Sequence, residues 1–277
     1  MGKICIITIN YNNKTGLQKT FESIQNQTYR DFEYIVIDGG STDGGLELNK
    51  KNNQISKWIS EKDSGVYNAM NKGIKLCSSD YIIFMNSGDT FYTNDVLEKV
   101  VPLLNFENEI VYGNAYYYND EGYKREEIPP SELTFWYLKV FGINHQSVFI
   151  KKKLFNDIQY YNEDFKICAD WEFFMIAICL KNVKYKYIPL TICYYDFSGI
   201  SAKKENIDLY LREKDLSLKK HFTIFYNDLI FLEISKTKRF KQFLHISQHK
   251  KISFRFLKWF MDIILLFTNK KRHIYNK

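Results

Sequence analysis

Short apolar runs alternate with amphipathic segments in the N-terminal part of the chain. Four apolar runs are short enough for buried strands and too short for ordinary helices: Lys3–Thr8, Phe32–Ile37, Ile55–Ile59 and Asp80–Met85. Apolar residues at helical spacing predict helices between and after these runs: Thr15–Gln25, a segment that ends near Leu48, Val66–Leu76 and Asp95–Leu104. Alternating strands and helices with short links are typical of a mostly parallel central sheet flanked by helices, so we predict an α/β fold.

The pattern is less regular in the middle of the chain. Strands are predicted at Glu109–Tyr118, Gln146–Ile150, Tyr185–Ile188 and Thr191–Tyr195, the last two on either side of Pro189. The mainly apolar segment Asp170–Leu180 predicts a buried helix, and helical patterning dominates from Glu205 onward. We therefore predict a domain of residues 1–204 and a helical C-terminal extension of residues 205–277.

The composition indicates a large hydrophobic core and no secretory features. Of 277 residues, 45% are hydrophobic, which is ample for one large domain, and no Gly/Ser linker or repeat divides the chain. The apolar stretch at the start is interrupted by threonine and ends at Asn10, unlike a signal peptide. The cysteines are odd in number and lack a CxxC spacing, which predicts reduced thiols in a cytoplasmic protein and no zinc site: Cys5, Cys77, Cys168, Cys179 and Cys193.

Positive charge is concentrated toward the C-terminus. The formal net charge is +7, and the chain from about Lys236 onward is rich in Lys and Arg, while the N-terminal half is nearer balance and argues against nucleic acid as a partner. The apolar stretch Phe254–Phe267 is interrupted by Lys258 and Asp262, and a membrane span needs about 20 predominantly apolar residues. Residues 250–272 therefore predict either a helix lying on an anionic membrane surface or a helix packed on the domain.

Polar side chains follow the predicted strands of the N-terminal part. Asn10, Asp38 and Asp89 come directly after three of the apolar runs, and Asp63 follows the fourth after a short link. Open parallel sheets bind ligands beyond the carboxyl ends of their strands, so these side chains are expected to line one edge of the sheet. Each alone would be an ordinary turn or cap residue, but four in succession favour a ligand site.

The chemistry at these strand ends favours a metal–diphosphate site. The sequence contains neither of the usual glycine-rich phosphate-binding motifs, so phosphates would have to be neutralised another way. A divalent metal held by the carboxylate of Asp89 would do so, and Asp38 could accept hydrogen bonds from a base or ribose. Lys62 and Lys72 could add positive charge, although a solvated role is the commoner one for lysine.

Four ordered motifs carry a family resemblance. They are Ile6-Ile-Thr-Ile-Asn-Tyr-Asn12, Val36-Ile-Asp-Gly-Gly-Ser-Thr-Asp-Gly44, Glu61-Lys-Asp-Ser-Gly-Val-Tyr-Asn-Ala-Met-Asn-Lys-Gly73 and Phe84-Met-Asn-Ser-Gly-Asp89. Together they resemble the inverting family 2 glycosyltransferases of bacterial polysaccharide synthesis, most of all the colanic-acid-type subgroup, over about residues 3–200. The resemblance implies a GT-A fold with a nucleotide-sugar-binding half, residues 1–105, an acceptor half, residues 106–204, and a divalent metal, Mn²⁺ or Mg²⁺.

The resemblance also implies which residues bind the donor. By position in the motifs, Thr8 and Asn10 contact the nucleoside, Asp38 binds the base, and Asp63 lies near the base and ribose. The turn of Asn86, Ser87, Gly88 and Asp89 occupies the DxD position of the family, with Asp89 as the metal ligand. The first acid of that motif is Asn86 here, and an amide ligates a metal more weakly than a carboxylate does. Lys62 and Asn71 are further candidates for substrate contacts.

The catalytic candidate comes from the second half of the chain. The segment Cys168-Ala-Asp-Trp-Glu172 resembles the Glu-Asp motif of the family, which implies that Asp170 is the general base and that Ala169 replaces the usual Glu. The alternative is that Asp170 caps the helix Trp171–Leu180, since Asp is a favoured N-cap residue. A helix N-terminus would lower the pKa of Asp170, whereas burial would raise it.

Other segments of the second half resemble parts of the family's substrate sites. His145 and Gln146 open a predicted strand and correspond to a His-Gln pair near the acceptor site. The segment Phe197–Ala202 resembles a loop that closes over the donor, in which Ser201 would touch the diphosphate. A lone histidine is more often structural, so His145 is the weaker candidate beside Asp170.

The resemblance leads to a specific functional prediction. The expected activity is transfer of a sugar, with inversion, from a nucleoside-diphosphate donor, most simply a UDP-sugar, to a glycan or lipid-diphosphate-linked acceptor for O-antigen, capsule or another cell-surface polysaccharide. The protein would be cytoplasmic, either free or peripheral on the inner face of the cytoplasmic membrane. Two alternatives stay open: a sugar nucleotidyltransferase, although Tyr11–Lys14 stands where a glycine-rich Arg loop is expected, and an inactive nucleotide-sugar- or polyanion-binding module.

Overall fold

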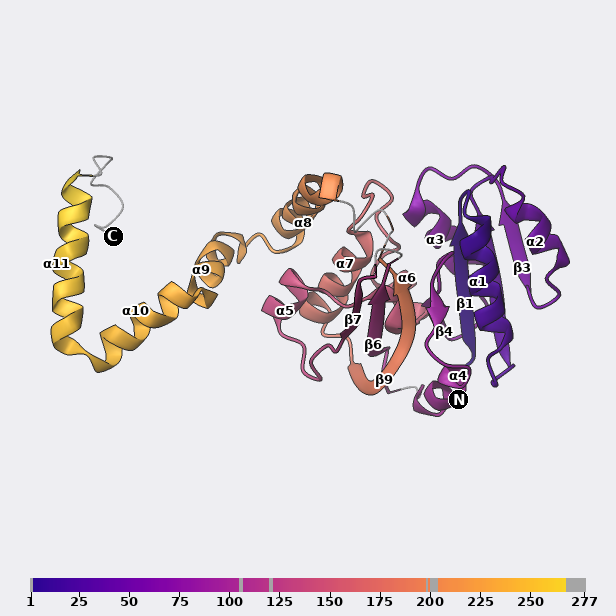
Figure 1. The fold of residues 1–277 in the computed structure, drawn as a ribbon, viewed down its shortest axis with the longest axis horizontal. Helices are drawn as coiled ribbons and strands as arrows, with labels where there is room; N and C mark the ends of the chain where they lie inside the picture. The colour runs from indigo at the N-terminus through magenta and orange to yellow at the C-terminus, as the bar shows by residue number, and fades with distance from the viewer. Residues whose placement is uncertain (1, 105–106, 120–121, 198, 200–203, 268–277) are drawn as a thin grey trace. The chain divides into compact units, whose positions relative to one another are not determined.

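The computed structural model describes residues 2–104, 107–119, 122–197, 199 and 204–267 of the chain (Figure 1). The chain forms two compact units, residues 1–217 and residues 218–277. The sequence predicted the division after residue 204, so the first unit extends further than expected.

A nine-stranded sheet runs through the first unit in the order β3-β2-β1-β4-β8-β6-β9-β5, with β7 paired to β6. The first four strands are parallel to one another: β1 (Ile4–Asn10), β2 (Phe32–Asp38), β3 (Lys57–Ser60) and β4 (Tyr81–Phe84). This is the predicted parallel part of the sheet, although β3 begins two residues later than the apolar run suggested. The four strands end at the same edge, which is where the predicted polar residues lie.

Helices cover both faces of this parallel part. They are α1 (Lys14–Gln25), α2 (Gly45–Lys51), α3 (Val66–Leu76) and α4 (Val96–Val100). Alternate residues of β1 point to opposite faces, so that Ile6 packs with Leu17 of α1 while Ile7 packs with Ile74 of α3. The predicted helix Asp95–Leu104 continues after α4 only as a 3₁₀ turn, because Pro102 cannot donate a helical hydrogen bond.

The remaining strands belong to the second half of the unit: β5 (Thr90–Phe91), β6 (Ile110–Tyr118), β7 (Lys124–Glu127), β8 (Val148–Lys151) and β9 (Tyr185–Asp196). The two strands predicted around Pro189 form the single strand β9, whose pairing with β6 shifts register next to Gly113. A Cβ atom on Gly113 would lie 2.4 Å from the carbonyl oxygen of Leu190, so the close approach of the two backbones requires glycine there. The short strands β5 and β7 were not predicted, since β7 is entirely charged in sequence.

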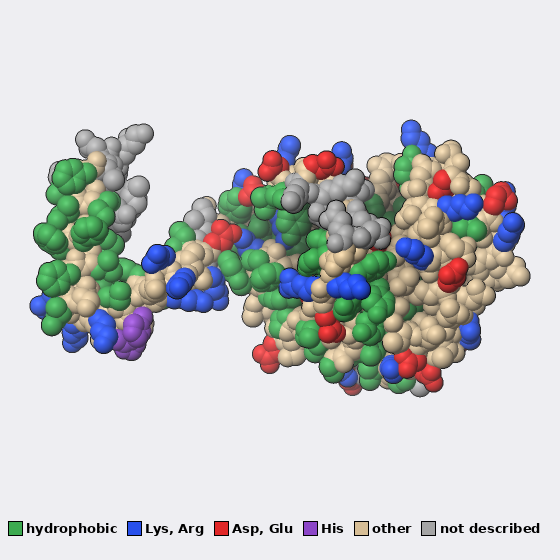
Figure 2. Space-filling view, in the orientation of Figure 1, with side chains coloured by type: hydrophobic (Ala, Val, Ile, Leu, Met, Phe, Trp, Pro, Cys, Tyr) green, Lys and Arg blue, Asp and Glu red, His purple; other side chains and the backbone are tan. Residues whose placement is uncertain are grey.

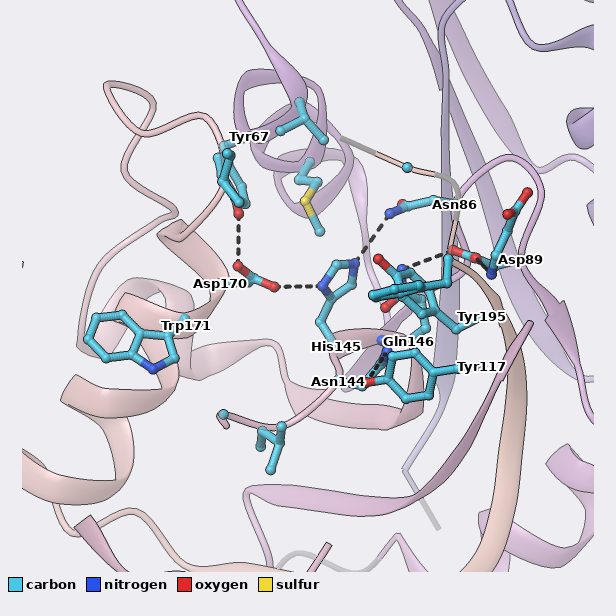
Figure 3. A pocket seen from close by; sticks show the side chains of 18 of the residues that line it. Tyr67, Asn86, Asp89, Tyr117, Asn144, His145, Gln146, Asp170, Trp171 and Tyr195 are labelled. Atoms are coloured by element: carbon cyan, nitrogen blue, oxygen red, sulfur yellow. Dashed lines mark hydrogen bonds and ion pairs between the residues drawn. The ribbon is translucent and has the colours of Figure 1, made fainter. Parts of the chain in front are cut away.

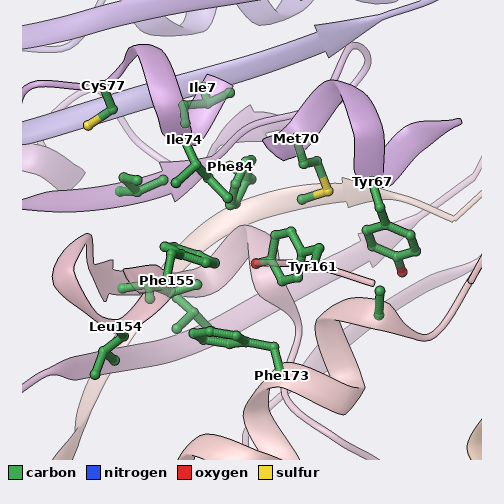
Figure 4. Packing of buried hydrophobic residues seen from close by; sticks show 14 of the residues in the cluster. Ile7, Tyr67, Met70, Ile74, Cys77, Phe84, Leu154, Phe155, Tyr161 and Phe173 are labelled. Atoms are coloured by element: carbon green, nitrogen blue, oxygen red, sulfur yellow. The ribbon is translucent and has the colours of Figure 1, made fainter. Parts of the chain in front are cut away.

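The two halves predicted at residues 1–105 and 106–204 share one hydrophobic core. Phe84 and Met70 of the first half face Phe155, Tyr161 and Phe173 of the second half in the cluster drawn in Figure 4. The rings of Phe155 and Phe173 stack with their centroids 4.7 Å apart. This shared core fixes the position of the second half against the strand ends of the first.

Three short helices complete the second half: α5 (Phe135–Val140), α6 (Lys153–Asp157) and α7 (Ala169–Phe174). The apolar helix predicted at Asp170–Leu180 is buried, but it is α-helical only through Phe174 and π-helical from Met175 to Leu180. Neither α5 nor α6 was predicted, because each is too short to display a helical period.

Helix α8 (Ile207–His221) explains why the first unit extends to residue 217. The buried carboxylate of Glu213 accepts hydrogen bonds from three successive backbone N–H groups, those of Lys166, Ile167 and Cys168, at 2.7–3.0 Å. The buried ammonium of Lys214 donates to the carbonyl of Lys139 at 3.1 Å. These contacts anchor the start of α8 beside the segment that leads into α7.

The second unit contains the end of α8 and three further helices: α9 (Tyr226–Lys236), α10 (Lys238–His249) and α11 (Lys251–Phe267). Among the described residues, no helix is both long enough and apolar enough to cross a membrane.

The cysteines are all unpaired, as predicted, and only Cys179 is not fully buried. The thiols of Cys5 and Cys77 lie within 4.8 Å of each other and of the carboxylate of Glu33. That carboxylate already receives hydrogen bonds from Ser78 and Ser79 and pairs with Lys57 at 2.8 Å. The negative charge of this group is therefore balanced by protein contacts.

Candidate active site

The carboxyl ends of β1, β2 and β4 bring most of the predicted donor-binding residues to one edge of the sheet. Asn10 and Asp38 are direct neighbours in the parallel pairing of β1 with β2. The turn from Asn86 to Asp89 follows β4, and its Ser87 hydroxyl donates to the side-chain oxygen of Asn10 at 2.9 Å. The predicted meeting of these strand ends is therefore present in the structure.

Asp38 is buried beneath this edge of the sheet and does not line a cavity of the site. Its carboxylate is completely buried and accepts hydrogen bonds from Asn10 at 2.8 Å, from Ser60 at 2.6 Å, and from the hydroxyl and backbone N–H of Ser41 at 2.6 and 2.9 Å. Burial raises the pKa of Asp38, but these hydrogen bonds outweigh it and leave the pKa below its usual value. With its oxygens occupied by protein donors, Asp38 holds the strand-end loop in place, and its contact with the base stays a prediction.

Two other predicted contact residues make buried hydrogen bonds within the protein. Thr8 is fully buried, and its hydroxyl donates to the carbonyl of Met85 at 2.8 Å. Asn71 is buried too, and its amide exchanges hydrogen bonds with the backbone of Tyr161 at 2.8 and 3.0 Å. Neither lines a cavity at the site, because alternation in β1 and the helical period of α3 turn both side chains into the interior.

A cavity of about 730 Å³ opens beyond these strand ends. Its walls come from the ends of β1 and β2, the segment before α3, the start of α3, and the turn after β4: Ile9, Asn10, Tyr11, Asn13, Gly39, Gly40, Lys62, Asp63, Ser64, Gly65, Val66, Ala69, Asn86 and Ser87. Lys62 and Asp63 therefore line this cavity, and Asp63 pairs with Lys72 at 2.6 Å. The size and mixed lining are those of a small-ligand pocket.

The turn after β4 buries its one carboxylate. The side chain of Asp89 is 3% exposed and accepts hydrogen bonds from the amide of Gln146 at 2.9 Å and from the backbone N–H of Asp196 at 3.0 Å. Burial raises the pKa of Asp89 to about 6, which means that these uncharged donors do not fully offset its negative charge. The carboxylate of Asp196 lies beside the same turn, with one oxygen 3.3 Å from the point that a Cβ atom added to Gly88 would occupy.

The donor set at this turn fits a divalent metal. A buried carboxylate with a second carboxylate close by supplies the oxygen ligands that Mn²⁺ and Mg²⁺ prefer, and a cation would offset the buried charge. The sequence did not identify Gln146 as the partner of Asp89, or Asp196 as a neighbour of the turn. Both depend on the tertiary packing that brings the end of β9 and the 3₁₀ turn at His145–Ser147 to the turn after β4.

A chain of polar contacts crosses the site from α3 to the turn after β4 (Figure 3). The hydroxyl of Tyr67 donates to Asp170 at 2.8 Å, the other carboxylate oxygen of Asp170 lies 2.6 Å from Nδ1 of His145, and Nε2 of His145 lies 3.2 Å from the amide nitrogen of Asn86. Asp170 is the second residue of α7, whose N-cap is Cys168, so Asp170 does not cap the helix. Its side chain faces His145 instead.

The electrostatics of Asp170 follow from these contacts. Burial raises its pKa, but the hydrogen bond and charge of His145 and the hydrogen bond from Tyr67 outweigh burial and leave the pKa lowered. The sequence predicted that the helix N-terminus and burial would shift the pKa of Asp170 in opposite directions. In the structure the side chains of His145 and Tyr67 decide the direction, and the sequence did not show these partners.

A second cavity, of about 450 Å³, contains this chain of contacts. Its polar members include Asp89, His145, Gln146 and Asp170. Aromatic side chains make up much of the remaining lining: Tyr67, Tyr117, Phe141, Trp171, Tyr195, Phe197 and Tyr210. Sequence reasoning missed Tyr117 and Tyr195, since they lie in β6 and β9 and tyrosine is an ordinary strand residue. The predicted contact Ser201 lies outside the described residues.

The two cavities share lining residues. Asn86 and Ser87 of the turn after β4 belong to both, as do Asn13 and Val66. A ligand in the larger cavity can therefore reach the turn of Asp89 and the pair of His145 and Asp170. This is the geometry that a reaction between two bound substrates requires.

Comparison with known proteins gives a consistent family relationship. The family model described as Glycosyl transferase family 2 matches residues 5–168. The chain is 33% identical over 213 residues to an uncharacterised glycosyltransferase of Mycobacterium tuberculosis, covering 73% of this chain and 78% of that protein. It is 29% identical over 211 residues to a PGL/p-HBAD biosynthesis glycosyltransferase of Mycobacterium bovis, covering 73% of this chain and 79% of that protein.

Solved structures confirm the predicted GT-A fold. Residues 1–349 of S. aureus TarS in complex with UDP-GlcNAc superpose with a TM-score of 0.61 at 18% identity, covering 78% of this chain and 66% of that one. A mannosyltransferase from Pyrobaculum calidifontis in complex with GDP-Man and Mn²⁺ superposes with a TM-score of 0.57 at 15% identity, covering 80% of this chain and 63% of that one. The chain thus spans slightly less than two thirds of either solved chain, and at these identities the likeness concerns the fold.

Proposed function

Because the chain belongs to glycosyl transferase family 2 and is a glycosyltransferase, we propose that it transfers a sugar with inversion from a UDP-sugar to a glycan or lipid-diphosphate-linked saccharide in cell-surface polysaccharide synthesis. The observation that carries this proposal is the junction of the two cavities at Asn86 and Ser87. The larger cavity is lined by Asn10 and Asp63, which match the donor-binding motifs of the family. The smaller cavity contains the pair of His145 and Asp170. TarS, which shares the fold, has been solved with UDP-GlcNAc, and this supports the choice of donor.

The donor lies in the larger cavity in this proposal, with its nucleoside beside Asn10 and Asp63 and its diphosphate at the turn after β4. Asp89 would hold the divalent metal, which when bound offsets the charge that develops on the departing nucleoside diphosphate. The Mn²⁺ in the structure of the Pyrobaculum enzyme supports a metal of this kind. Mn²⁺ and Mg²⁺ both suit the oxygen ligands of this chain.

The acceptor lies in the aromatic cavity. Rings such as those of Tyr117 and Trp171 offer large apolar faces with a polar edge, which suits the mixed apolar and hydroxyl surface of a sugar. The pair of His145 and Asp170 then lies next to the acceptor hydroxyl and supplies the base. Attack from this side, opposite the leaving diphosphate, inverts the configuration at the anomeric carbon.

The proposed activity is tested by release of nucleoside diphosphate from a panel of nucleotide sugars, with lipid-diphosphate saccharides as acceptors. We expect release that requires Mn²⁺ or Mg²⁺, stops when EDTA removes the metal, and returns when the metal is added in excess. Release of pyrophosphate instead would identify a nucleotidyltransferase. Donor binding without any turnover across the panel would identify a binding module.

Helix α11 supports a membrane-bound acceptor. Its apolar side chains are exposed in the second unit, and Figure 2 shows them gathered over the helix with Lys and Arg side chains at its N-terminal end: Ile252, Phe256, Trp259, Phe260, Met261, Ile264, Leu265, Leu266 and Phe267. Lys250, Lys251, Arg255 and Lys258 are exposed as well. An apolar face bordered by cations is the pattern of a helix that lies in an anionic lipid surface, and we propose this role for α11 at the inner face of the cytoplasmic membrane.

Removal of α11 is expected to release the protein from lipid. In co-sedimentation with vesicles containing phosphatidylglycerol, the full chain should pellet at low salt and a version ending at Lys250 should remain in the supernatant. A matched variant with Lys251, Arg255 and Lys258 changed to Gln keeps the apolar face and should lose mainly the preference for anionic over neutral vesicles. Equal sedimentation of the full and shortened chains would contradict the proposal.

A further inference from the structure

Helix α8 reaches the aromatic cavity from outside the region that matches the family. The helix begins at Ile207, whereas the family match ends at residue 168. Tyr210 of α8 lines the cavity together with Trp171 of α7. The cavity proposed for the acceptor is therefore built partly by a helix that the sequence assigned to a C-terminal extension.

A buried ammonium group lies close to both of these rings. Nζ of Lys214 is 4.8 Å from the centre of the Trp171 ring and 4.3 Å from the centre of the Tyr210 ring. Lys214 is 7% exposed, and burial lowers its pKa to about 8, so the side chain is mostly charged at neutral pH. A desolvated cation is attracted to an aromatic face more strongly than an exposed one. Lys214 therefore holds the two rings in fixed positions relative to each other.

The same ammonium group also supports the end of α5. It donates to the carbonyl of Lys139 at 3.1 Å and to the next carbonyl along the chain at 3.3 Å, and the indole N–H of Trp171 donates to the carbonyl of Leu138 at 2.7 Å. The last carbonyls of a helix have no partner within it, so these donors complete α5. The chain that follows α5, residues 141–146, lines the cavity. Lys214 thus supports a second part of the cavity wall.

A second buried charge fixes α8 against α7. Glu213 is 4% exposed, and its carboxylate accepts hydrogen bonds from the backbone N–H groups of residues 166–168, which lead into α7. Hydrogen bonds to a charged acceptor are stronger than those between neutral groups. The larger cavity, proposed for the donor, is lined by residues between Ile9 and Ser87. A change in α8 should therefore affect the acceptor and not the donor.

We propose that α8 determines which acceptor is bound: Tyr210 is a specificity-determining residue that contacts the acceptor sugar, and Lys214 is a positioning residue that holds Tyr210 and Trp171 in place. This inference rests on the proposed glycosyltransferase function and names the element that selects its acceptor. A saccharide suits this wall because the apolar face of a sugar ring packs on an aromatic ring while its hydroxyls reach polar groups beside it.

The first test is Lys214→Met, which removes the charge and keeps most of the apolar stem. With a short-chain polyprenyl-diphosphate monosaccharide as acceptor, we expect the acceptor KM to rise by about tenfold, because the rings and the end of α5 lose their common support. The donor KM should change by less than about twofold, as should the slow release of nucleoside diphosphate without acceptor. Lys214→Arg keeps the charge and stacks on rings, so it should retain most of the acceptor affinity.

The control for Lys214→Met is Lys220→Met, the same change at an exposed position of the same helix, which should leave the acceptor KM unchanged. Thermal unfolding of every variant separates loss of folded protein from loss of affinity. An equal fall in kcat with and without acceptor, at an unchanged acceptor KM, would overturn the positioning role, since Lys214 would then only stabilise the fold. An Arg variant as impaired as the Met variant would overturn the role of the charge.

The second test is a pair of changes at Tyr210. We expect Tyr210→Ala to raise the acceptor KM by about tenfold, whereas Tyr210→Phe keeps the ring and should stay within about threefold of the wild type. In the double variant with Lys214→Met, the rise should be smaller than the product of the two single effects, because Lys214 acts partly through the ring that is already lost. Effects that multiply fully would contradict that coupling.

Two further outcomes separate this inference from the proposed function. An active wild type whose acceptor KM is unchanged in Tyr210→Ala would overturn the acceptor contact and leave the glycosyltransferase proposal intact. A wild type that releases no nucleoside diphosphate with any donor of the panel would overturn the proposed function, and the role of α8 with it.

Discussion

Replacement of Asp89 by alanine is expected to abolish sugar transfer, with a loss in kcat/KM on the order of 10³-fold or more, because it removes the carboxylate that would hold the metal at the leaving diphosphate. Calorimetry should show that the donor no longer binds more tightly when Mn²⁺ is added. Turnover should be measured by nucleoside diphosphate release at saturating metal, so that weakened metal binding is distinguished from complete loss of the metal site.

The control for Asp89→Ala must separate chemistry from folding. Truncation leaves the amide of Gln146 and the backbone N–H of Asp196 without their acceptor, so some loss of thermal stability is expected in the same variant. Asp95→Ala provides a matched substitution, since Asp95 is an acid on the same half of the chain that is 40% exposed and pairs with Lys99 at the surface. Wild-type turnover by Asp89→Ala would refute the placement of the diphosphate at the turn after β4.

Asp170→Asn is expected to retain donor binding and to lose about 10²–10⁴-fold in kcat. The substitution keeps the shape of the side chain, but an amide cannot take up the proton that the acceptor hydroxyl loses. Steady-state kinetics, with donor affinity measured separately, test both expectations.

The same variant has a predictable effect on folding. The pKa of Asp170 is lowered in the folded protein, so its ionised form stabilises the fold above the pKa of the unfolded chain, and this contribution is lost as the pH falls through the lower folded value. Asp170→Asn should therefore be less stable than the wild type at neutral pH, and the difference should shrink in acid. Asp157→Asn, the same change at an exposed position, is the control. Near-normal turnover by Asp170→Asn would reduce Asp170 to a structural residue.

The periodic part of the sequence predicted the fold well. The parallel strands β1, β2 and β4 and the helices α1 and α3 lie within a few residues of the predicted segments. Each of them is long enough to show its own hydrophobic period. The elements that were missed, β5, β7, α5 and α6, are short or polar, and their conformations depend on what they pack against.

The sequence predicted part of the site, because the topology of a parallel sheet brings certain strand ends together. Asn10, Asp63 and the turn ending at Asp89 follow strands of one parallel sheet, and parallel strands end at the same edge, so their proximity follows from topology. The topology of the sheet does not determine which side chains at that edge face a cavity. Thr8 and Asp38 match the family motifs, yet both face the interior and hold the strand ends together.

The sequence by itself therefore determined the fold class, the edge of the sheet at which the polar strand ends meet, and the family. Only the tertiary structure decided that Tyr67, Asp170, His145 and Asn86 form one connected chain of contacts, because they come from α3, α7, a 3₁₀ turn and the turn after β4. Hydrophobic periodicity encodes which face of an element is buried, and it carries no information about which distant side chain that face meets. That pairing was decided by the core that packs the second half of the unit against the first.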